Sequence, residues 1–259
     1  IHIGGRERSS TLYISREHAR TLLSDITRAT NTQNRIVPRD FASLDPQQPR
    51  LQQDLFLENG KTYSFHTGDP LSSKDEGCTI DEAAVALACR RNIELTVRAK
   101  SYVSGLYDEI DKPPYTILFN EKLSARKMWN LVQISRIVED ALAEFRDNAR
   151  PEARLPLVHG NRFIQHIVLQ AIPEPDLEEP EMIATWGKKN IKAATREAAA
   201  CVVDTILTHF PNAYTGSLFK SLEKCRMLAE HMSNASGKSL RSSLLQPEQA
   251  PLFKTLYES

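Results

Sequence analysis

A run of apolar side chains at helical spacing constrains this chain more than any other feature of its sequence. Between residues 128 and 145 the apolar positions recur with the period of one α-helical face, while Arg136 and Glu139 lie off that face. We therefore predict a long helix in which Leu131, Val138 and Leu142 are buried. The face consists of Met128, Leu131, Val132, Ser135, Val138, Leu142 and Phe145.

Helical patterns fill most of the chain on both sides of this stretch. The segment "TIDEAAVALACRR" joins an alanine-rich body to the capping-box pair Thr79 and Glu82, and a second helix follows to about residue 107. We expect Pro151 and Pro156 to end the long helix. "GNRFIQHIVLQAI" then predicts a further helix, residues 184–209 predict a long amphipathic helix, and "SLFKSLEKCRMLAEHM" predicts the last one.

The amino-terminal part of the chain has weaker and more mixed patterns. "IHIGGRERSSTLYIS" predicts one or two short strands around a Gly-Gly turn, and residues 16–30 carry helical spacing. A short turn of helix is expected after Pro38, then a helix over residues 46–57 closed by Asn59 and Gly60, and a strand in "KTYSFHT". The predicted fold class is α+β and predominantly α-helical. It has a small strand-containing portion over residues 1–75, a helical domain over 76–232 and a tail over 233–259.

The composition limits the classes of partner and compartment. The chain has 33 basic and 33 acidic side chains, so any contact with nucleic acid must depend on a local patch. No run of about 18 apolar residues is present, which argues against a membrane span. The cysteines form no Cys-x-x-Cys pair, so we predict no metal site. We expect them to be free buried thiols in the reducing cytosol, which corresponds to a cytoplasmic location. They are Cys78, Cys89, Cys201 and Cys225.

The chain carries no catalytic signature that we recognise. Phosphate-binding, dinucleotide-binding and nucleophile-elbow glycine motifs are missing from the sequence, so enzymatic activity and cofactors stay open. His159 and His166 are seven residues apart and could share a helix face, although we expect them to bond to nearby carbonyls or water. Lys188, Lys189 and Lys192 could contact phosphate, but a solvated helix start is the preferred interpretation.

Amides and arginines gather at the end of the helix predicted over residues 16–30. Amide side chains both donate and accept hydrogen bonds, and a guanidinium fork suits phosphate or carboxylate. The segment therefore predicts a binding site for phosphate or nucleic acid. The alternative is that the amides cap the helix while the arginines pair with Asp25, Asp40 and Asp45. We call residues 28–39 the amide–arginine segment, and its candidate binding residues are Arg28, Asn31, Gln33, Asn34, Arg35 and Arg39.

The sequence around this segment resembles a known family. "DITRATNTQNRIVPRDFASLDPQQPRLQQDL" resembles the core motif of the AIPR family, the abortive-infection phage-resistance proteins of bacteria. "TIDEAAVALAC", "PPYTILFN" and "LVHGNRFIQHIV" also look like this family, so the resemblance runs from about residue 12 to 170. The motif positions are Ile26, Asn31, Gln33, Asn34, Ile36, Asp40, Phe41, Asp45 and Leu51.

The resemblance implies a role in antiphage defence. It suggests the carboxyl-terminal part of such a protein, binding nucleic acid or nucleotide, with any nuclease activity in an amino-terminal half that precedes Ile1. By analogy with ParB-like proteins, "IHIGG" would be the last strand of a small α/β domain. The alternative is a structural or oligomerising helical domain that forms a homo-oligomer and supports a nuclease elsewhere in the full-length protein.

Overall fold

The computed structural model describes residues 2–3, 6–7, 38–66, 69 and 73–235. Contacts divide the chain into two compact units, residues 1–37 and 38–259. In the first unit, β1 (His2–Ile3) pairs antiparallel with β2 (Arg6–Glu7), with His2 opposite Glu7. This is the predicted pair of short strands. The helix predicted over residues 16–30 and the tail from residue 236 lie outside the described residues.

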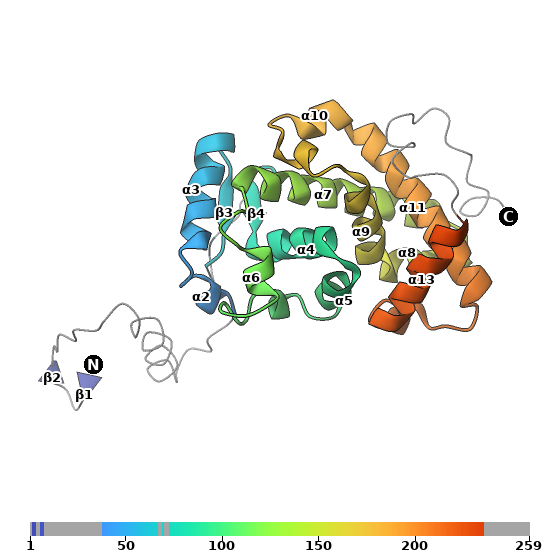
Figure 1. The fold of residues 1–259 in the computed structure, drawn as a ribbon, viewed down its shortest axis with the longest axis horizontal. Coiled ribbons are helices and arrows are strands. Elements are labelled where there is room, and N and C mark those ends of the chain that lie inside the picture. Colours follow the sequence, from blue (N-terminus) through green and yellow to red (C-terminus); the bar gives the residue numbers. More distant parts are fainter. Residues whose placement is uncertain (1, 4–5, 8–37, 67–68, 70–72, 236–259) are drawn as a thin grey trace. The chain divides into compact units, whose positions relative to one another are not determined.

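The second unit is a helical domain with one small parallel sheet (Figure 1). Strand β3 (Thr62–Ser64) pairs in parallel with β4 (Gly77–Thr79), and α3 packs against β3. The predominantly helical α+β class predicted from the sequence is thereby confirmed. The described helices are α2 (Pro38–Ala42), α3 (Gln47–Asn59), α4 (Ile80–Arg91), α5 (Ile93–Ser101), α6 (Tyr115–Leu118), α7 (Ala125–Asn148), α8 (Pro151–His159), α9 (Asn161–Ala171), α10 (Met182–Trp186), α11 (Lys188–His209), α12 (Thr215–Leu218) and α13 (Leu222–Ala235), with 3-10 turns η1 (Ser104–Leu106) and η2 (Pro175–Glu178).

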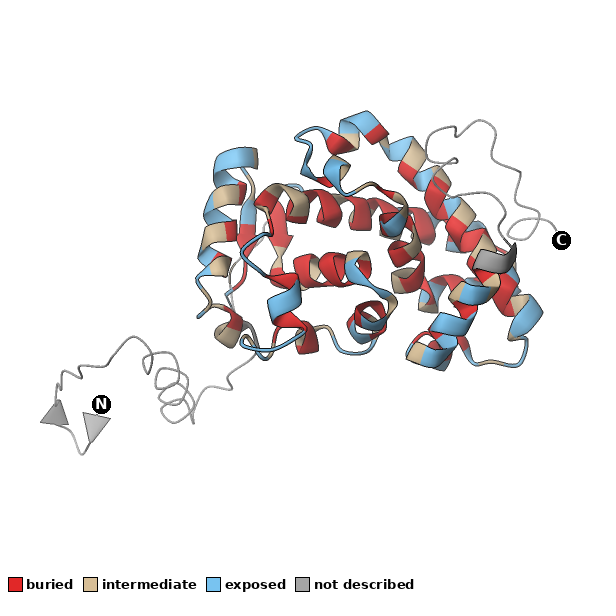
Figure 2. Cartoon of the chain, viewed as in Figure 1, coloured by how far each residue is buried: buried red, intermediate tan, exposed pale blue. Residues whose placement is uncertain are grey.

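Helix α7 is the central element of the second unit. It contacts α3, α4, α8, α9 and α11, and 13 of its 24 residues are buried. Figure 2 shows these buried residues along the helix. Leu131 and Val138 are fully buried and Leu142 is 5% exposed, as the apolar spacing predicts. Ile134 and Ala141, which lie outside the predicted face, are also fully buried. The helix is therefore enclosed by neighbours on more sides than an amphipathic stripe indicates.

Local capping interactions fix the ends of several helices. The Thr79 hydroxyl accepts from the backbone N–H of Glu82 at 3.3 Å, and the Glu82 carboxylate accepts from the backbone N–H of Thr79 at 3.1 Å. This is the predicted capping box of α4. Helix α3 ends at Gly60, whose φ of 63° is a left-handed conformation that glycine adopts without strain. Gly77 is required for another reason, since a Cβ there would lie 1.9 Å from the carbonyl oxygen of Thr62 in the paired strand.

The carboxyl-terminal half departs from the predicted boundaries in three places. One is the last helix, predicted over residues 217–232, which is α12 and α13 with residues 219–221 between them. The long helix α7 ends at Asn148, before Pro151, as predicted, but Pro156 lies inside α8. Because proline has no backbone N–H, the helical hydrogen bond to the carbonyl of Glu152, an exposed residue, is not formed. The single helix predicted over residues 184–209 is two helices, because Gly187 adopts a φ of 75° between α10 and α11. Because α8 ends at His159 and α9 begins at Asn161, His159 and His166 lie on different helices and do not share a helix face.

All four cysteines are free thiols. Cys78, Cys89 and Cys225 are buried as predicted, whereas Cys201 is half-buried. Burial raises the pKa of Cys78 and of Cys89 to about 12, so both thiols stay protonated. Among the described residues, no helix combines the length and apolar character needed to cross a membrane.

Candidate functional site: a polar pocket beside helix α7

The amide–arginine segment falls almost entirely outside the described residues. Arg28, Asn31, Gln33, Asn34 and Arg35 all lie there, so their predicted binding role stays a prediction. Arg39 belongs to α2 by its backbone, and its side chain is likewise not described.

The short helix after Pro38 is present where the sequence predicts it. Its five residues include Asp40 in the first turn. That carboxylate places negative charge in the first turn of the helix. This negative charge disfavours the binding of a second anion at the helix start.

The residues that follow this segment form a closed polar cluster, which we call the Gln48 network. The Tyr63 hydroxyl donates to the Gln48 side-chain oxygen at 2.6 Å, and the Gln48 amide donates to the Tyr115 hydroxyl at 2.8 Å. Tyr115 in turn donates to the Asp45 carboxylate at 2.6 Å. Burial, reinforced by the bond to Asp45, raises the pKa of Tyr115 well above its usual value. These contacts join α3, β3 and α6 and stabilise the fold.

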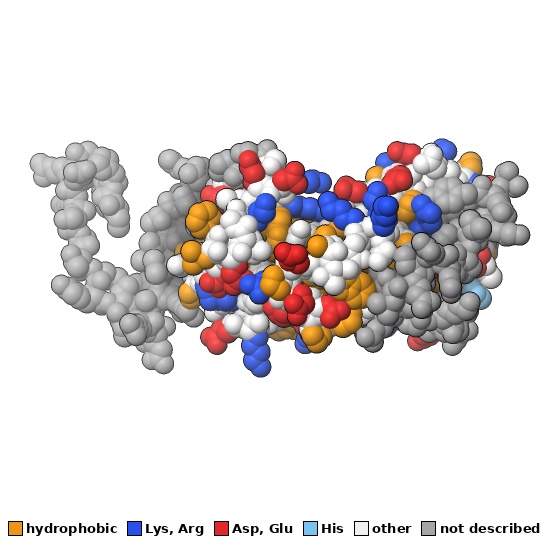
Figure 3. Space-filling view, turned by 90° about the horizontal axis from the view of Figure 1, so that it is seen from above, with side chains coloured by type: hydrophobic (Ala, Val, Ile, Leu, Met, Phe, Trp, Pro, Cys, Tyr) orange, Lys and Arg blue, Asp and Glu red, His pale blue; other side chains and the backbone are white. Residues whose placement is uncertain are grey.

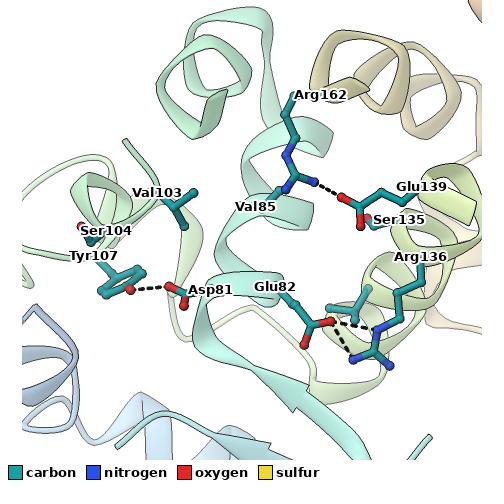
Figure 4. A pocket seen from close by; sticks show the side chains of 11 residues that line it. Asp81, Glu82, Val85, Val103, Ser104, Tyr107, Ser135, Arg136, Glu139 and Arg162 are labelled. Atoms are coloured by element: carbon teal, nitrogen blue, oxygen red, sulfur yellow. Dashed lines mark hydrogen bonds and ion pairs between the residues drawn. The ribbon is translucent and has the colours of Figure 1, made fainter. Parts of the chain in front are cut away.

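A second polar cluster lines an open pocket of about 450 Å³, which we call the Arg162 pocket (Figure 4). Its wall is formed by α4, the turn around η1, α7 and α9. Val85, Val103 and Val132 give it an apolar lining, and charged side chains stand around them. A volume of this size suits a small-molecule ligand.

Arg136, on α7, bonds to the protein through all three of its side-chain nitrogens. Its Nε donates to the Glu82 carboxylate at 3.0 Å, and its Nη2 donates to the Gly77 carbonyl at 2.7 Å. Its Nη1 donates to the carbonyl of Lys74, and the guanidinium lies 5.4 Å from the ring centroid of Trp129. Arg136 therefore fixes α7 to the start of α4 and serves as part of the wall.

Arg162, on α9, is only partly engaged. Its Nη1 donates to the Glu139 carboxylate at 2.5 Å and to the Gln165 side-chain oxygen at 3.0 Å. Within the part of the chain that the structure describes, its Nε and Nη2 have no bonded partner. The side chain is 23% exposed, and Figure 4 shows its head beside Glu139. Arg162 can therefore donate to a bound molecule.

The opposite side of the pocket carries a tyrosine–carboxylate pair. The Tyr107 hydroxyl donates to Asp81, which lies in the first turn of α4. The lining thus includes the carboxylates of Asp81, Glu82 and Glu139 against two guanidiniums. The pocket has an excess of one negative charge.

The histidines and lysines singled out in the sequence have other surroundings. The Nδ1 of His166 lies 2.6 Å from the Cys89 carbonyl, the kind of contact predicted for it, and burial lowers its pKa. His159 contacts the ring of Tyr214, and burial lowers its pKa too. Lys192 pairs with Glu144 at 3.0 Å. On the face shown in Figure 3, a row of Lys and Arg side chains runs beside acidic ones. In the described ranges, no three potential metal-ligating side chains come together.

The sequence analysis did not identify the Arg162 pocket, although the pattern around three of its charged residues was visible in the sequence. Arg136 and Glu139 border the apolar face of α7, and Glu82 is the capping residue of α4. A charged residue at the edge of a long apolar face must find a partner where that face is covered. Applying this rule to α7 would have marked both residues as members of a polar cluster.

The fold is a predominantly helical α+β arrangement built around α7, with an open polar pocket beside that helix. The chain belongs to the AIPR family: the family model described as "AIPR protein" matches residues 10–142, about half of the chain. This confirms the resemblance found in the sequence and suggests an abortive-infection, antiphage defence role. The match spans the amide–arginine segment, the Gln48 network and the pocket residues on α4, η1 and α7. No curated protein and no solved structure matches the chain.

Proposed function

We propose that this chain is the part of a bacterial abortive-infection protein that binds nucleic acid or nucleotide, with the amide–arginine segment contacting phosphate. The observation that carries the proposal is the position of this segment inside the residues matched by the family model. The segment places three guanidiniums and three amides within twelve residues of a chain whose net charge is zero. Such a local concentration provides the patch that phosphate binding requires.

The test is binding of fluorescently labelled single-stranded RNA, single-stranded DNA and duplex DNA over a range of salt concentrations. The double variant R28A/R35A should bind at least about tenfold more weakly and should reduce the salt slope by about 1.5 to 2, because two phosphate contacts are lost. R146A is the matched control, since Arg146 is an exposed arginine that pairs, among the described residues, with its neighbour Asp147 and lies beyond the matched residues.

The capping alternative predicts the opposite pattern. N31A and Q33A would then lower the melting temperature, because the amides would hold the loop through backbone hydrogen bonds. R28A/R35A would leave nucleic-acid binding unchanged. That combination would remove the phosphate-binding role from this segment.

A second candidate function is a structural or oligomerising role. It is favoured by the exposed apolar residues at the end of α3, where Phe56 is 62% and Leu57 is 70% exposed. Adjacent large apolar side chains on a surface are typical of protein–protein contacts. If this end of α3 joins two copies, F56S/L57S should halve the molecular mass measured by light scattering. An unchanged mass would exclude this surface as the interface.

A further inference from the structure

The Arg162 pocket presents one edge that is ready to form hydrogen bonds. Glu139 and Arg162 lie side by side, and each uses only part of its capacity on the other: Glu139 bonds through Oε1, and Arg162 bonds through Nη1. Oε2 of Glu139 remains as an acceptor, and Nε and Nη2 of Arg162 remain as donors, with no bonded partner among the described residues. The result is an acceptor placed next to a pair of donors.

Apolar and uncharged polar side chains also line the pocket around this edge. Val85 and Val132 flank it on α4 and α7, and Val103 lies opposite on the turn before η1. Branched aliphatic side chains of this kind suit the face of a flat ring. The Ser104 hydroxyl is also in the lining and has no bonded partner in the described part of the chain.

The charge balance argues against a phosphate in this pocket. In the described lining three carboxylates stand against two guanidiniums, and Arg136 is largely engaged because each of its three nitrogens already bonds to a protein acceptor. Among the described lining residues, a phosphate group would therefore meet one partly engaged arginine, Arg162, and more carboxylates than guanidiniums. A neutral ligand with a donor next to an acceptor meets none of these costs.

We propose that the Arg162 pocket binds a nucleobase, as a free nucleoside or as an unpaired base of a single strand. Every nucleobase carries adjacent donors and acceptors on its edge, and arginine and glutamate are side chains that read such edges. The base edge bonds to Glu139 and Arg162 while its ring lies against the valines. This inference rests on the proposed function, since it names the part of the nucleotide or nucleic acid that the second unit recognises.

The test uses guanosine, adenosine, cytidine and uridine as probes, with binding to the full chain measured by calorimetry and ligand-observed NMR. At least one nucleoside should bind with a Kd below about 1 mM. R162A should weaken that binding at least about tenfold, since it removes charge-assisted hydrogen bonds. V103W should abolish it by filling the pocket while Arg162 stays in place, and R146A should leave it unchanged.

Two sources of the base are separated by a second measurement. If the pocket accepts bases of a single strand, R162A should also weaken binding of single-stranded RNA or DNA and leave duplex DNA unaffected. If it accepts only free nucleosides, R162A should leave both nucleic acids unaffected. V103W must agree with R162A in either case, which guards against an R162A protein that folds poorly.

The outcomes also separate this inference from the proposed function. Absence of nucleoside binding by the parent chain, or binding that survives both R162A and V103W, overturns the pocket assignment. Salt-dependent nucleic-acid binding that still requires Arg28 and Arg35 would then leave the proposed function standing. Conversely, nucleoside binding that requires Arg162, together with no effect of R28A/R35A on nucleic acid, would keep the pocket and remove the phosphate-binding segment.

Discussion

The Gln48 network and the Arg162 pocket are built from similar side chains and behave differently. Each contains a tyrosine hydroxyl that donates to an aspartate, Tyr115 to Asp45 in the network and Tyr107 to Asp81 in the pocket. In the network, Gln48 is completely buried and both ends of its amide are bonded to tyrosines. In the pocket, donors of Arg162 reach the cavity without a partner among the described residues. Residue type thus does not separate a structural polar cluster from a binding site; the number of unused donors and acceptors does.

This difference has an energetic consequence. Removing one member of a closed, buried network leaves its partners without hydrogen bonds in a medium that water does not reach. Removing one member of an open cluster leaves partners that water can hydrate. We therefore expect the network to dominate stability and the pocket to dominate ligand binding.

The largest expected effect is that of Q48A. The substitution leaves the hydroxyls of Tyr63 and Tyr115 each short of a partner and opens a cavity, so it should lower the free energy of unfolding by about 3 kcal/mol. Urea denaturation measures the change. Q53A, an exposed position on the same helix, should cost less than about 0.5 kcal/mol. Equal losses for the two variants would show that the network is not closed as described.

A matched pair of tyrosine substitutions sharpens the comparison. Y115F removes a hydroxyl that donates to Asp45 and accepts from Gln48. It should lower the free energy of unfolding by about 1 to 2 kcal/mol. Y107F removes a hydroxyl that donates to half-buried Asp81 at the pocket, and should cost less than about 1 kcal/mol. Thermal and urea unfolding of both variants decide the order. A larger loss for Y107F would reverse our assignment of the two clusters.

The smallest expected effect concerns pH. Burial lowers the pKa of His166 below its ordinary value of 6.5, so the folded protein holds this imidazole neutral while the unfolded chain can protonate it. Stability should be unaffected by this group well above pH 6.5 and should decline as pH falls from 6.5 toward the lowered pKa. H166Q should reduce the decline relative to the parent chain. An identical pH profile for the two proteins would contradict the role given to His166.

The features that were predicted from the sequence are local ones. The Thr79–Glu82 capping box, the end of α3 at Asn59 and Gly60, and the buried positions of α7 each depend on residues within a few turns of one another. The motif around the amide–arginine segment also indicated the AIPR family, to which the chain belongs by its match to the family model. Such signals are readable because capping and helical periodicity act over three or four residues.

The wrong predictions arose where surroundings override local preference. Pro156 predicts a helix end, but α8 continues through it, and the carbonyl left without its helical partner belongs to Glu152, an exposed residue. The apolar spacing over residues 184–209 predicts one helix, but Gly187 allows a turn that local hydrophobic periodicity does not reveal. A proline or glycine inside a helical pattern can therefore be accommodated, as Pro156 is, or can divide the helix, as Gly187 does. The packing around the residue decides between these outcomes.

By itself, the sequence determined that this chain is mainly helical, where several of its helices begin and end, and to which family it belongs. Only the tertiary structure decided which polar residues meet. Gln48 and Tyr115 are 67 residues apart and Arg162 and Glu139 are 23 apart, on different helices in both cases. Their partnership depends on how α3 packs near α6 and how α9 packs against α7, which no local rule fixes. Because a hydrogen bond requires its two atoms to lie within about 3 Å, only the packed chain distinguishes a closed polar network from an open pocket.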